Sequence, residues 1–120
     1  MHTGDEIPKV NSGAALSEAL LEMSSKALGM TTVLNSDGTL AGIFTDGDLR
    51  RTLDKAVDIH NTIIDAVMTR NGKTIGADHL AAEALNIMDA LKINALPVTN
   101  PAGDLVGAIN MHDLLRAGVI

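Results

Sequence analysis

Apolar residues recur at two different spacings, and these spacings alternate along the chain. Residues 11–29 carry an apolar face at helical spacing, which predicts an amphipathic helix. Two short runs rich in Val, Ile and Thr follow at 30–34 and 40–45, and a Ser-Asp-Gly turn signal separates them, so they predict an antiparallel hairpin. A second helix is expected over 46–53. A brief edge strand at 7–10 precedes all of these elements.

The pattern occurs twice, because a shift of 65 positions aligns the second half with the first. The aligned pairs include Leu16 with Ala81, Ala19 with Ala84, Leu20 with Leu85, Met23 with Met88, Val33 with Val98, Gly42 with Gly107 and Asp48 with Asp113. The second half is therefore predicted to have strands at 73–75, 95–99 and 105–109 and helices at 79–91 and 111–117. The sequence predicts an α/β (α+β) fold of two β-α-β-β-α halves related by a pseudo-two-fold axis.

The boundary between the halves is expected at residue 60, with one motif at 1–60 and the other at 61–120. The connector over 54–62 is polar and is expected to be partly helical, and Thr62 is expected to cap a short helix over 63–68. Asn11 or Ser12 is expected to cap the first long helix in the same way. Each half alone is too small to bury a stable core, so the two halves should pack on each other.

A strand that leads directly into a helix is the most distinctive feature of each half. The two junctions read Thr45-x-x-Asp48 and Asn110-x-x-Asp113. Free N–H groups at a helix N-terminus attract phosphate or carboxylate, and an acid one turn later can accept hydrogen bonds from sugar hydroxyls. The junction therefore favours a nucleotide or sugar-phosphate site. The same residues also fit a capping box that only satisfies the helix ends, and the sequence leaves both interpretations open.

Composition and charge narrow the functional classes. The formal net charge of −6 argues against nucleic-acid binding. No apolar run is long enough to span a membrane, and the absence of cysteine fits a cytoplasmic protein. Phe44 is the only aromatic residue and lies in the middle of a predicted strand, so it is expected in the core. A bound base would then rest on aliphatic side chains and backbone groups.

Neither metal-binding nor catalytic motifs are found in the sequence. His2, His60, His79 and His112 have no metal-ligand spacing, so no metal and no required cofactor are expected. Asp46 and Asp48 form the one pair of acids that would suit hydrolysis, but no nucleophile accompanies them. A catalytic role for this pair is kept as a third hypothesis, and no catalytic residue is assigned.

The repeated strand–helix junctions, together with Leu96-Pro97-Val98 ahead of the second one, resemble a tandem pair of cystathionine-β-synthase (CBS) domains over the whole chain. This resemblance implies a pseudo-symmetric disc with two clefts between the halves. It also implies a regulatory module that binds adenosine-type nucleotides, is not itself an enzyme and forms a homodimer. A purely structural oligomerisation module without a ligand is the alternative.

The resemblance assigns site residues to matching positions. Thr45 stands where the family has its hydroxyl residue, Asp48 and Asp113 stand where it has the ribose-binding acid, and Asn110 replaces the second hydroxyl residue. The complete set of ligand-binding residues expected is Met30, Thr31, Thr45, Asp46, Asp48, Arg51, Ala95, Leu96, Asn110, His112 and Asp113. Arg50 and Arg116 add positive charge near the helix starts. A solvated helix face explains Arg50 and Arg51 equally well.

A closer resemblance involves the C-terminal part of the arabinose 5-phosphate isomerases. It rests on the stretches 1–5, 43–51 and 111–119, of which the second reads Ile-Phe-Thr-Asp-Gly-Asp-Leu-Arg-Arg. It implies that a sugar isomerase domain precedes this chain in a longer protein of lipopolysaccharide biosynthesis. It also implies CMP-Kdo, the activated product of that pathway, as a feedback ligand, with an AMP-type nucleotide as the alternative.

Overall fold

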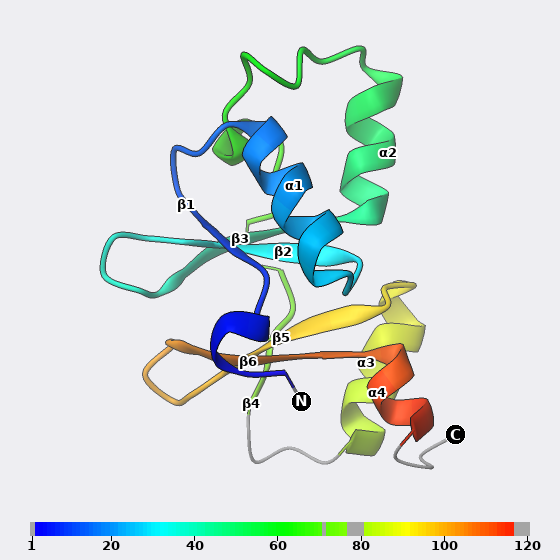
Figure 1. Ribbon diagram of the computed structural model, residues 1–120. Coiled ribbons are helices and arrows are strands. Elements are labelled where there is room, and N and C mark those ends of the chain that lie inside the picture. Colours follow the sequence, from blue (N-terminus) through cyan, green and yellow to red (C-terminus); the bar gives the residue numbers. More distant parts are fainter. Residues whose placement is uncertain (1, 71, 77–80, 117–120) are drawn as a thin grey trace.

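Two similar α/β halves form the molecule, as the computed structural model shows (Figure 1). The structure describes residues 2–70, 72–76 and 81–116. Each half contains a three-stranded sheet with helices packed beside it. The mixed α/β fold and its twofold repetition were predicted from the sequence and are confirmed.

The first half runs through η1 (Gly4–Glu6), β1 (Lys9–Asn11), α1 (Leu16–Lys26), β2 (Met30–Leu34), β3 (Leu40–Thr45) and α2 (Asp46–Asp54). Its sheet has the order β1-β2-β3, with β1 parallel and β3 antiparallel to β2. The register of the hairpin shifts between Val33 and Leu34, which marks a bulge. The antiparallel hairpin is formed by the two runs that the sequence pattern selects.

The second half repeats this arrangement with η2 (Ile64–Ala66), β4 (Ile75–Gly76), α3 (Ala81–Leu91), β5 (Ala95–Thr99), β6 (Leu105–Asn110) and α4 (Met111–Arg116). Its sheet has the order β4-β5-β6 with the same strand directions. The register shift recurs between Val98 and Thr99, which are the positions equivalent to the first bulge. The repeat therefore extends to irregular details of the backbone. The predicted start of the third helix, His79, lies outside the described residues.

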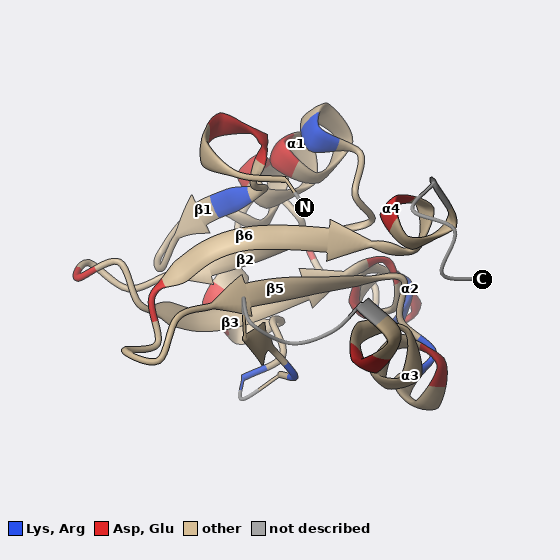
Figure 2. Cartoon of the chain, turned by 90° about the horizontal axis from the view of Figure 1, so that it is seen from below, with Lys and Arg blue, Asp and Glu red and all other residues tan. Residues whose placement is uncertain are grey.

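Strands β2, β3, β5 and β6 carry no charged residue, and the charges lie on helices, loops and β1 (Figure 2). This composition suits strands that are covered by protein. Phe44 of β3 is fully buried among Leu16, Val33 and Met23, as expected from its position in the strand. The second half has its own core around Met88 of α3.

Each half contributes a short segment to the sheet of the other half, and we call these two segments the exchanged segments. Thr69, which precedes β4, pairs with Ile43 of β3 through two backbone hydrogen bonds of 2.8 and 3.0 Å. His2, which precedes β1, pairs with Ala108 of β6 through bonds of 2.8 and 2.9 Å. Ile43 and Ala108 are equivalent positions of the repeat. This exchange ties the halves together in a reciprocal way.

Apolar side chains also pack across the boundary between the halves. Ile64 and Met68 precede the second sheet in the chain, yet both pack in the core of the first half. Ile7 joins a third cluster whose members come from both halves: Ile7, Leu28, Met30, Ala95 and Ala108. Thr39 and Asp104, the equivalent residues of the two hairpin loops, also form a bridge to each other. The halves are thus packed on one another, as their small size requires.

Two predicted helix caps are wrong, because tertiary contacts satisfy the helix ends instead. The N-cap of α1 is Ala15, whose side chain cannot cap. The first N–H groups of α1 donate to the connector, Leu16 to the carbonyl of Thr62 at 2.8 Å and Ser17 to that of Ile59 at 3.0 Å. The connector is consequently shaped as a cap for α1 and is not helical over 55–62, where part of a helix was expected.

Ser12, which was expected to cap α1, binds Asp65 of η2 instead. The hydrogen bond from the Ser12 hydroxyl and a second one from the Gly13 N–H, at 2.7 Å, hold the pKa of Asp65 below its usual range. The short helix expected over 63–68 is only the 3-10 turn η2, and its N-cap is Ile63 without any side-chain cap, not Thr62. The polar residues thus join segments far apart in the chain, and spacing alone does not reveal such contacts.

Gly42 is required where the exchanged segment crosses β3. A Cβ atom at this position would lie 2.8 Å from Met68 Sδ and 2.8 Å from the carbonyl oxygen of Thr69. We expect Gly42→Ala to destabilise the fold by about 1–3 kcal/mol, because the Thr69 backbone cannot move without losing its bonds to Ile43. Urea unfolding of the purified chain measures this change.

Gly47→Ala is the matched control for that substitution. Its Cβ would meet no heavy atom closer than 3.6 Å, the Nη1 of Arg51, and the position lies in a helix. We expect this variant to be neutral or more stable by about 0.4–1 kcal/mol. A Gly42→Ala variant as stable as the wild type would show that the exchanged segment is not tightly held.

Candidate ligand site between the two halves

The junction between β3 and α2 is built as a capping box. The Thr45 Oγ1 accepts a hydrogen bond from the Asp48 N–H at 3.2 Å, and the Thr45 N–H donates to Asp48 Oδ2 at 2.9 Å. These bonds satisfy backbone groups that the start of a helix leaves unpaired. The capping geometry that the sequence left open as one interpretation is therefore present.

Asp48 does more than cap the helix, because its other carboxylate oxygen joins two further elements. Oδ1 accepts bonds from Arg51 Nη2 at 2.6 Å and from Thr69 Oγ1 at 3.0 Å, while Oδ2 also accepts from Thr45 Oγ1 at 3.1 Å. With the backbone bond, the carboxylate has four donors, which is about its full capacity. A sugar hydroxyl reaches this acid only by replacing one of them. Arg51 is the most replaceable, since its side chain is 67% exposed.

A cavity of about 380 Å³ lies beside this junction, between the two halves. Its lining residues come from the β3–α2 junction and the start of β2 in the first half and from the α3–β5 connection in the second: Gly29, Met30, Thr45, Asp46, Gly47, Arg50, Arg51, Leu91, Lys92, Ile93, Asn94 and Ala95. The volume falls within the range of small-molecule pockets. The N-terminus of the nine-residue helix α2 opens onto it.

The cavity is basic in a chain whose net charge is −6. Arg50, Arg51 and Lys92 line it, and Asp46 is the one acid among the described residues of its wall. Within the described part of the chain, Arg50 and Lys92 form no ion pair, so both charges are available to a ligand. Cations next to the positive end of a helix dipole favour an anion.

The apolar part of the cavity can hold an uncharged ring. Met30, Ile93 and Ala95 line it, and no aromatic residue does. This matches the expectation that a base would rest on aliphatic side chains. Gly47 leaves the backbone at the start of α2 bare, since a glycine there presents no side chain to an approaching phosphate.

Asn110 and Asp113 reproduce the capping box at the start of α4. The Asn110 N–H donates to Asp113 Oδ2 at 2.8 Å, and the Asp113 N–H donates to Asn110 Oδ1 at 3.0 Å. Asn110 thus fulfils the role of Thr45. The second oxygen, Asp113 Oδ1, lies 3.0 Å from Nε2 of His2.

The predicted site residues divide into three groups by their positions. Five of them line the cavity: Met30, Thr45, Asp46, Arg51 and Ala95. Asp48 lies directly behind that wall, and the side chains of Thr31 and Leu96 are buried in the protein interior. Asn110, His112 and Asp113 stand at the equivalent junction of the second half.

Leu91, Lys92, Ile93 and Asn94 were not assigned to the site from the sequence. Leu91 ends α3 and the other three lie in the loop after it, and only the packing of the halves brings them to the start of α2. The repeat itself offered one signal, because Asn94 and Ile93 are equivalent to Gly29 and Leu28, which precede β2. Together with the two clefts that the family resemblance implied, this equivalence pointed to both of these connections.

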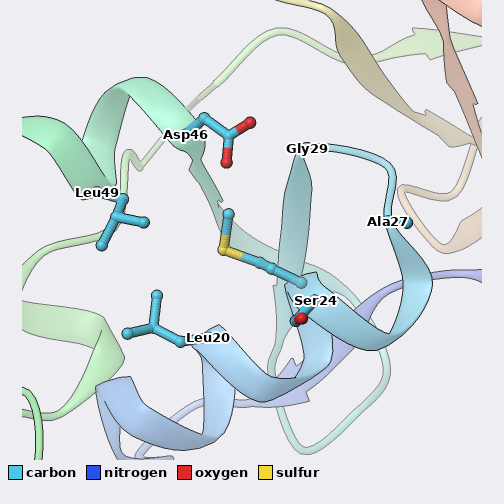
Figure 3. A pocket seen from close by; sticks show the side chains of 7 residues that line it. Leu20, Ser24, Ala27, Gly29, Asp46 and Leu49 are labelled. Atoms are coloured by element: carbon cyan, nitrogen blue, oxygen red, sulfur yellow. The ribbon is translucent and has the colours of Figure 1, made fainter.

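A second cavity, of about 490 Å³, lies between α1 and α2 (Figure 3). Leu20 and Leu49 face it from the two helices, and Asp46 stands at its edge next to Gly29. Asp46 and Gly29 also line the basic cavity, so the two hollows share one wall. Its apolar lining distinguishes it from the basic cavity.

In the residues that the structure describes, no three His, Cys, Asp or Glu side chains gather as they would around a metal ion. Among the same residues, no helix has both the length and the apolar character needed to cross a membrane.

Comparison with known proteins identifies the family. The model of the CBS domain family matches residues 1–55 and 64–120, so this chain belongs to the CBS domain family. It is 58% identical over its whole length to an arabinose 5-phosphate isomerase KdsD of Pseudomonas aeruginosa and 50% identical to that of Escherichia coli. It spans only 37% and 36% of those two relatives.

Solved structures show the same fold. An uncharacterised conserved protein from Pyrococcus horikoshii superposes with a TM-score of 0.83 at 26% identity, over 98% of this chain and 88% of that one. A CBS domain protein from Pyrobaculum aerophilum, solved as a complex with AMP, gives a TM-score of 0.82 at 16% identity over the full length of both chains. The resemblance to CBS pairs inferred from the sequence is confirmed.

Proposed function

We propose that this chain is the nucleotide-sensing regulatory module of an arabinose 5-phosphate isomerase, and that CMP-Kdo binds in the basic cavity between the halves. The single observation that carries the proposal is this cavity, where Arg50, Arg51 and Lys92 meet the start of α2. AMP in the complex of the Pyrobaculum aerophilum protein supports a nucleotide in this fold. The names of the relatives support the isomerase and the pathway to Kdo.

The cavity suits a ligand with an anion at one end and an uncharged base at the other. The phosphate would meet the bare backbone at Gly47 and the side chain of Arg50. The base would lie against Met30 and Ile93. The carboxylate of the Kdo sugar gives CMP-Kdo a second negative charge, for which Lys92 is available.

Asp48 would contribute by exchanging partners. It is held by Arg51 through a 2.6 Å bond in the structure described here. An incoming phosphate attracts the exposed Arg51 side chain, and the freed Oδ1 can then accept a ribose hydroxyl. The capping bonds to Thr45 use the other oxygen and persist. The acid can thus serve both the helix and the ligand, so the capping box does not rule out the sensing role.

A thermal-shift screen with CMP-Kdo, CMP, AMP, ATP and arabinose 5-phosphate tests the proposal most directly. A ligand present at 100 times its Kd should stabilise the fold by about 2.7 kcal/mol and raise its Tm. The alternative of a purely structural module predicts no rise with any of the five compounds. A rise with AMP or ATP alone would identify an AMP-type nucleotide in place of CMP-Kdo.

Asp48→Ala separates the sensing role from capping alone. Charge-assisted hydrogen bonds are worth about 1.5–3 kcal/mol, so loss of Asp48 should weaken nucleotide binding by at least about tenfold. The same change should cost the free protein about 1 kcal/mol through the lost cap. Calorimetric titration measures the first effect and urea unfolding measures the second.

Asp54→Ala serves as the control, because Asp54 is an exposed acid at the far end of the same helix. It should leave nucleotide affinity unchanged. If Asp48→Ala and Asp113→Ala both fold and keep the full ligand-induced rise in Tm, the two acids are only caps and the proposed role is wrong.

The chain by itself should have no isomerase activity. The isomerase chemistry of the relatives would then reside in the part of them that this chain does not span. Incubation of the purified chain with arabinose 5-phosphate, followed by assay for the ketose product, checks this expectation. Turnover that disappears in Asp46→Asn would instead support the hydrolase-like pair Asp46 and Asp48 as a catalytic site.

A cytoplasmic homodimer is the assembly that we propose. Leu21 of α1 is 73% exposed and Leu53 of α2 is 58% exposed, which leaves apolar surface for a second copy. Sedimentation at tens of micromolar should show a dimer, and Leu21→Glu should shift it toward the monomer. Ser25→Glu, which adds the same charge to an exposed position of α1, should not. A wild-type monomer at that concentration would contradict the dimer.

A further inference from the structure

The two equivalent acids of the repeat have different partners. Asp48 Oδ1 accepts a bond from the hydroxyl of Thr69 at 3.0 Å. At the same place in the second half, Asp113 Oδ1 is contacted by Nε2 of His2 at 3.0 Å. Thr69 and His2 both belong to the exchanged segments, and they pair with Ile43 and Ala108, which are equivalent residues of the repeat. The two halves therefore share a backbone arrangement, but the side chains that contact their equivalent acids differ.

His2 is fixed from three sides. Its backbone pairs with Ala108 of β6, its Nδ1 lies 3.0 Å from Glu6 Oε1, and its Nε2 contacts Asp113 of α4. The imidazole is 23% exposed and the Asp113 side chain 11% exposed, so this contact is partly shielded from water. Ile7 is buried in the central cluster a few residues later. The imidazole thus acts as an anchor between the N-terminal segment and the first turn of α4.

Two of the three cations that line the first cavity are replaced in the second half, whereas Arg51 corresponds to Arg116. Arg50 and Lys92 correspond to Leu115 and Ala27, which carry no charge. Gly47, which leaves the backbone bare, corresponds to His112, which carries a side chain at the equivalent position. Lys26 corresponds to Leu91 and is the one cation gained, but it is paired with Glu22 at 3.2 Å.

We infer that the two halves have divided their tasks: the first-half cavity takes one anionic nucleotide per chain, and Asp113 anchors the N-terminal segment through His2 instead of binding a second one. The nucleotide part rests on the proposed function, whereas the anchor does not. His2 is a positioning residue in this scheme. It engages Asp113 Oδ1 from the N-terminal segment, whereas Asp48 Oδ1 is engaged by the exposed Arg51, which an anion can attract away.

Amide hydrogen exchange followed by NMR tests the anchor without any ligand. In His2→Ala, the amide of Ala108, which donates to the His2 carbonyl at 2.9 Å, should exchange at least about tenfold faster than in the wild type. The amide of Ile43, bonded to Thr69 at 3.0 Å, is the internal reference and should not change.

His60→Ala is the matched variant, because His60 is exposed on the connector and its bond to Asp58 is made by its backbone N–H. It should leave the exchange of both amides unchanged. If His2→Ala leaves the Ala108 amide as slow as in the wild type, the imidazole does not anchor the segment and the inference is overturned.

Titration of the wild-type chain with CMP tests the division of tasks. Amide shifts should concentrate on Gly47, Arg50 and Lys92 and should saturate at one nucleotide per chain. Two nucleotides per chain, or the largest shifts at the start of α4, would overturn the assignment to the first half. If CMP shifts no amide at all, the proposed function and the nucleotide part of this inference both fail for this probe, while the Ala108 measurement still decides the anchor.

Discussion

The fold depends on the reciprocal pairing of two short segments with the sheets of the opposite halves. Two backbone hydrogen bonds hold each segment in place, one pair at Ile43–Thr69 and the other at His2–Ala108. Ile64 and Met68 complete the first core from a position that follows it in the chain. Without this pairing each half would expose a sheet edge and an incomplete core, both of which are costly. The exchange also positions the cavity, because it sets how the halves face each other.

The same pairing delivers side chains to the two helix starts. Thr69 and His2 lie on the exchanged segments, and each contacts the acid one turn into α2 or α4. The acids therefore connect three features: the helix cap, the contact between the two halves and the proposed ligand site. A mutation of Thr69 would therefore act on the proposed ligand site, since Asp48 accepts bonds from both Thr69 and Arg51.

The hydrophobic pattern was sufficient to predict the repeated unit and most of its elements. Strands β2, β3 and β5 begin and end where the pattern indicates, since their apolar runs are bounded by turn residues or helix starts. Helix ends were predicted less well. Ala15 stands at the N-cap of α1, and the capping groups are carbonyls of the distant connector, which no local pattern reveals. The boundary between motifs at residue 60 stays a prediction.

Site prediction was limited for a related reason. The repeated junction pointed to Thr45, Asp46 and Arg51, which line the cavity, because a helix start has a sequence signature. Lys92 and Ile93 reach the same cavity from a loop without any signature. Thr31 and Leu96 matched family positions, but their side chains point into the interior, as strand alternation allows for every second residue.

The N-terminal segment belongs to the first half in sequence but contacts the second half in space. Residue 2 begins the described part of the first half, yet it is bonded to β6 and α4 of the second. A pull applied at this residue would be transmitted first to the start of α4, and it would reach β1 only after the bonds to Ala108 had opened. A force applied from the N-terminal side would therefore act on the second half before the first, although the second half comes later in the sequence.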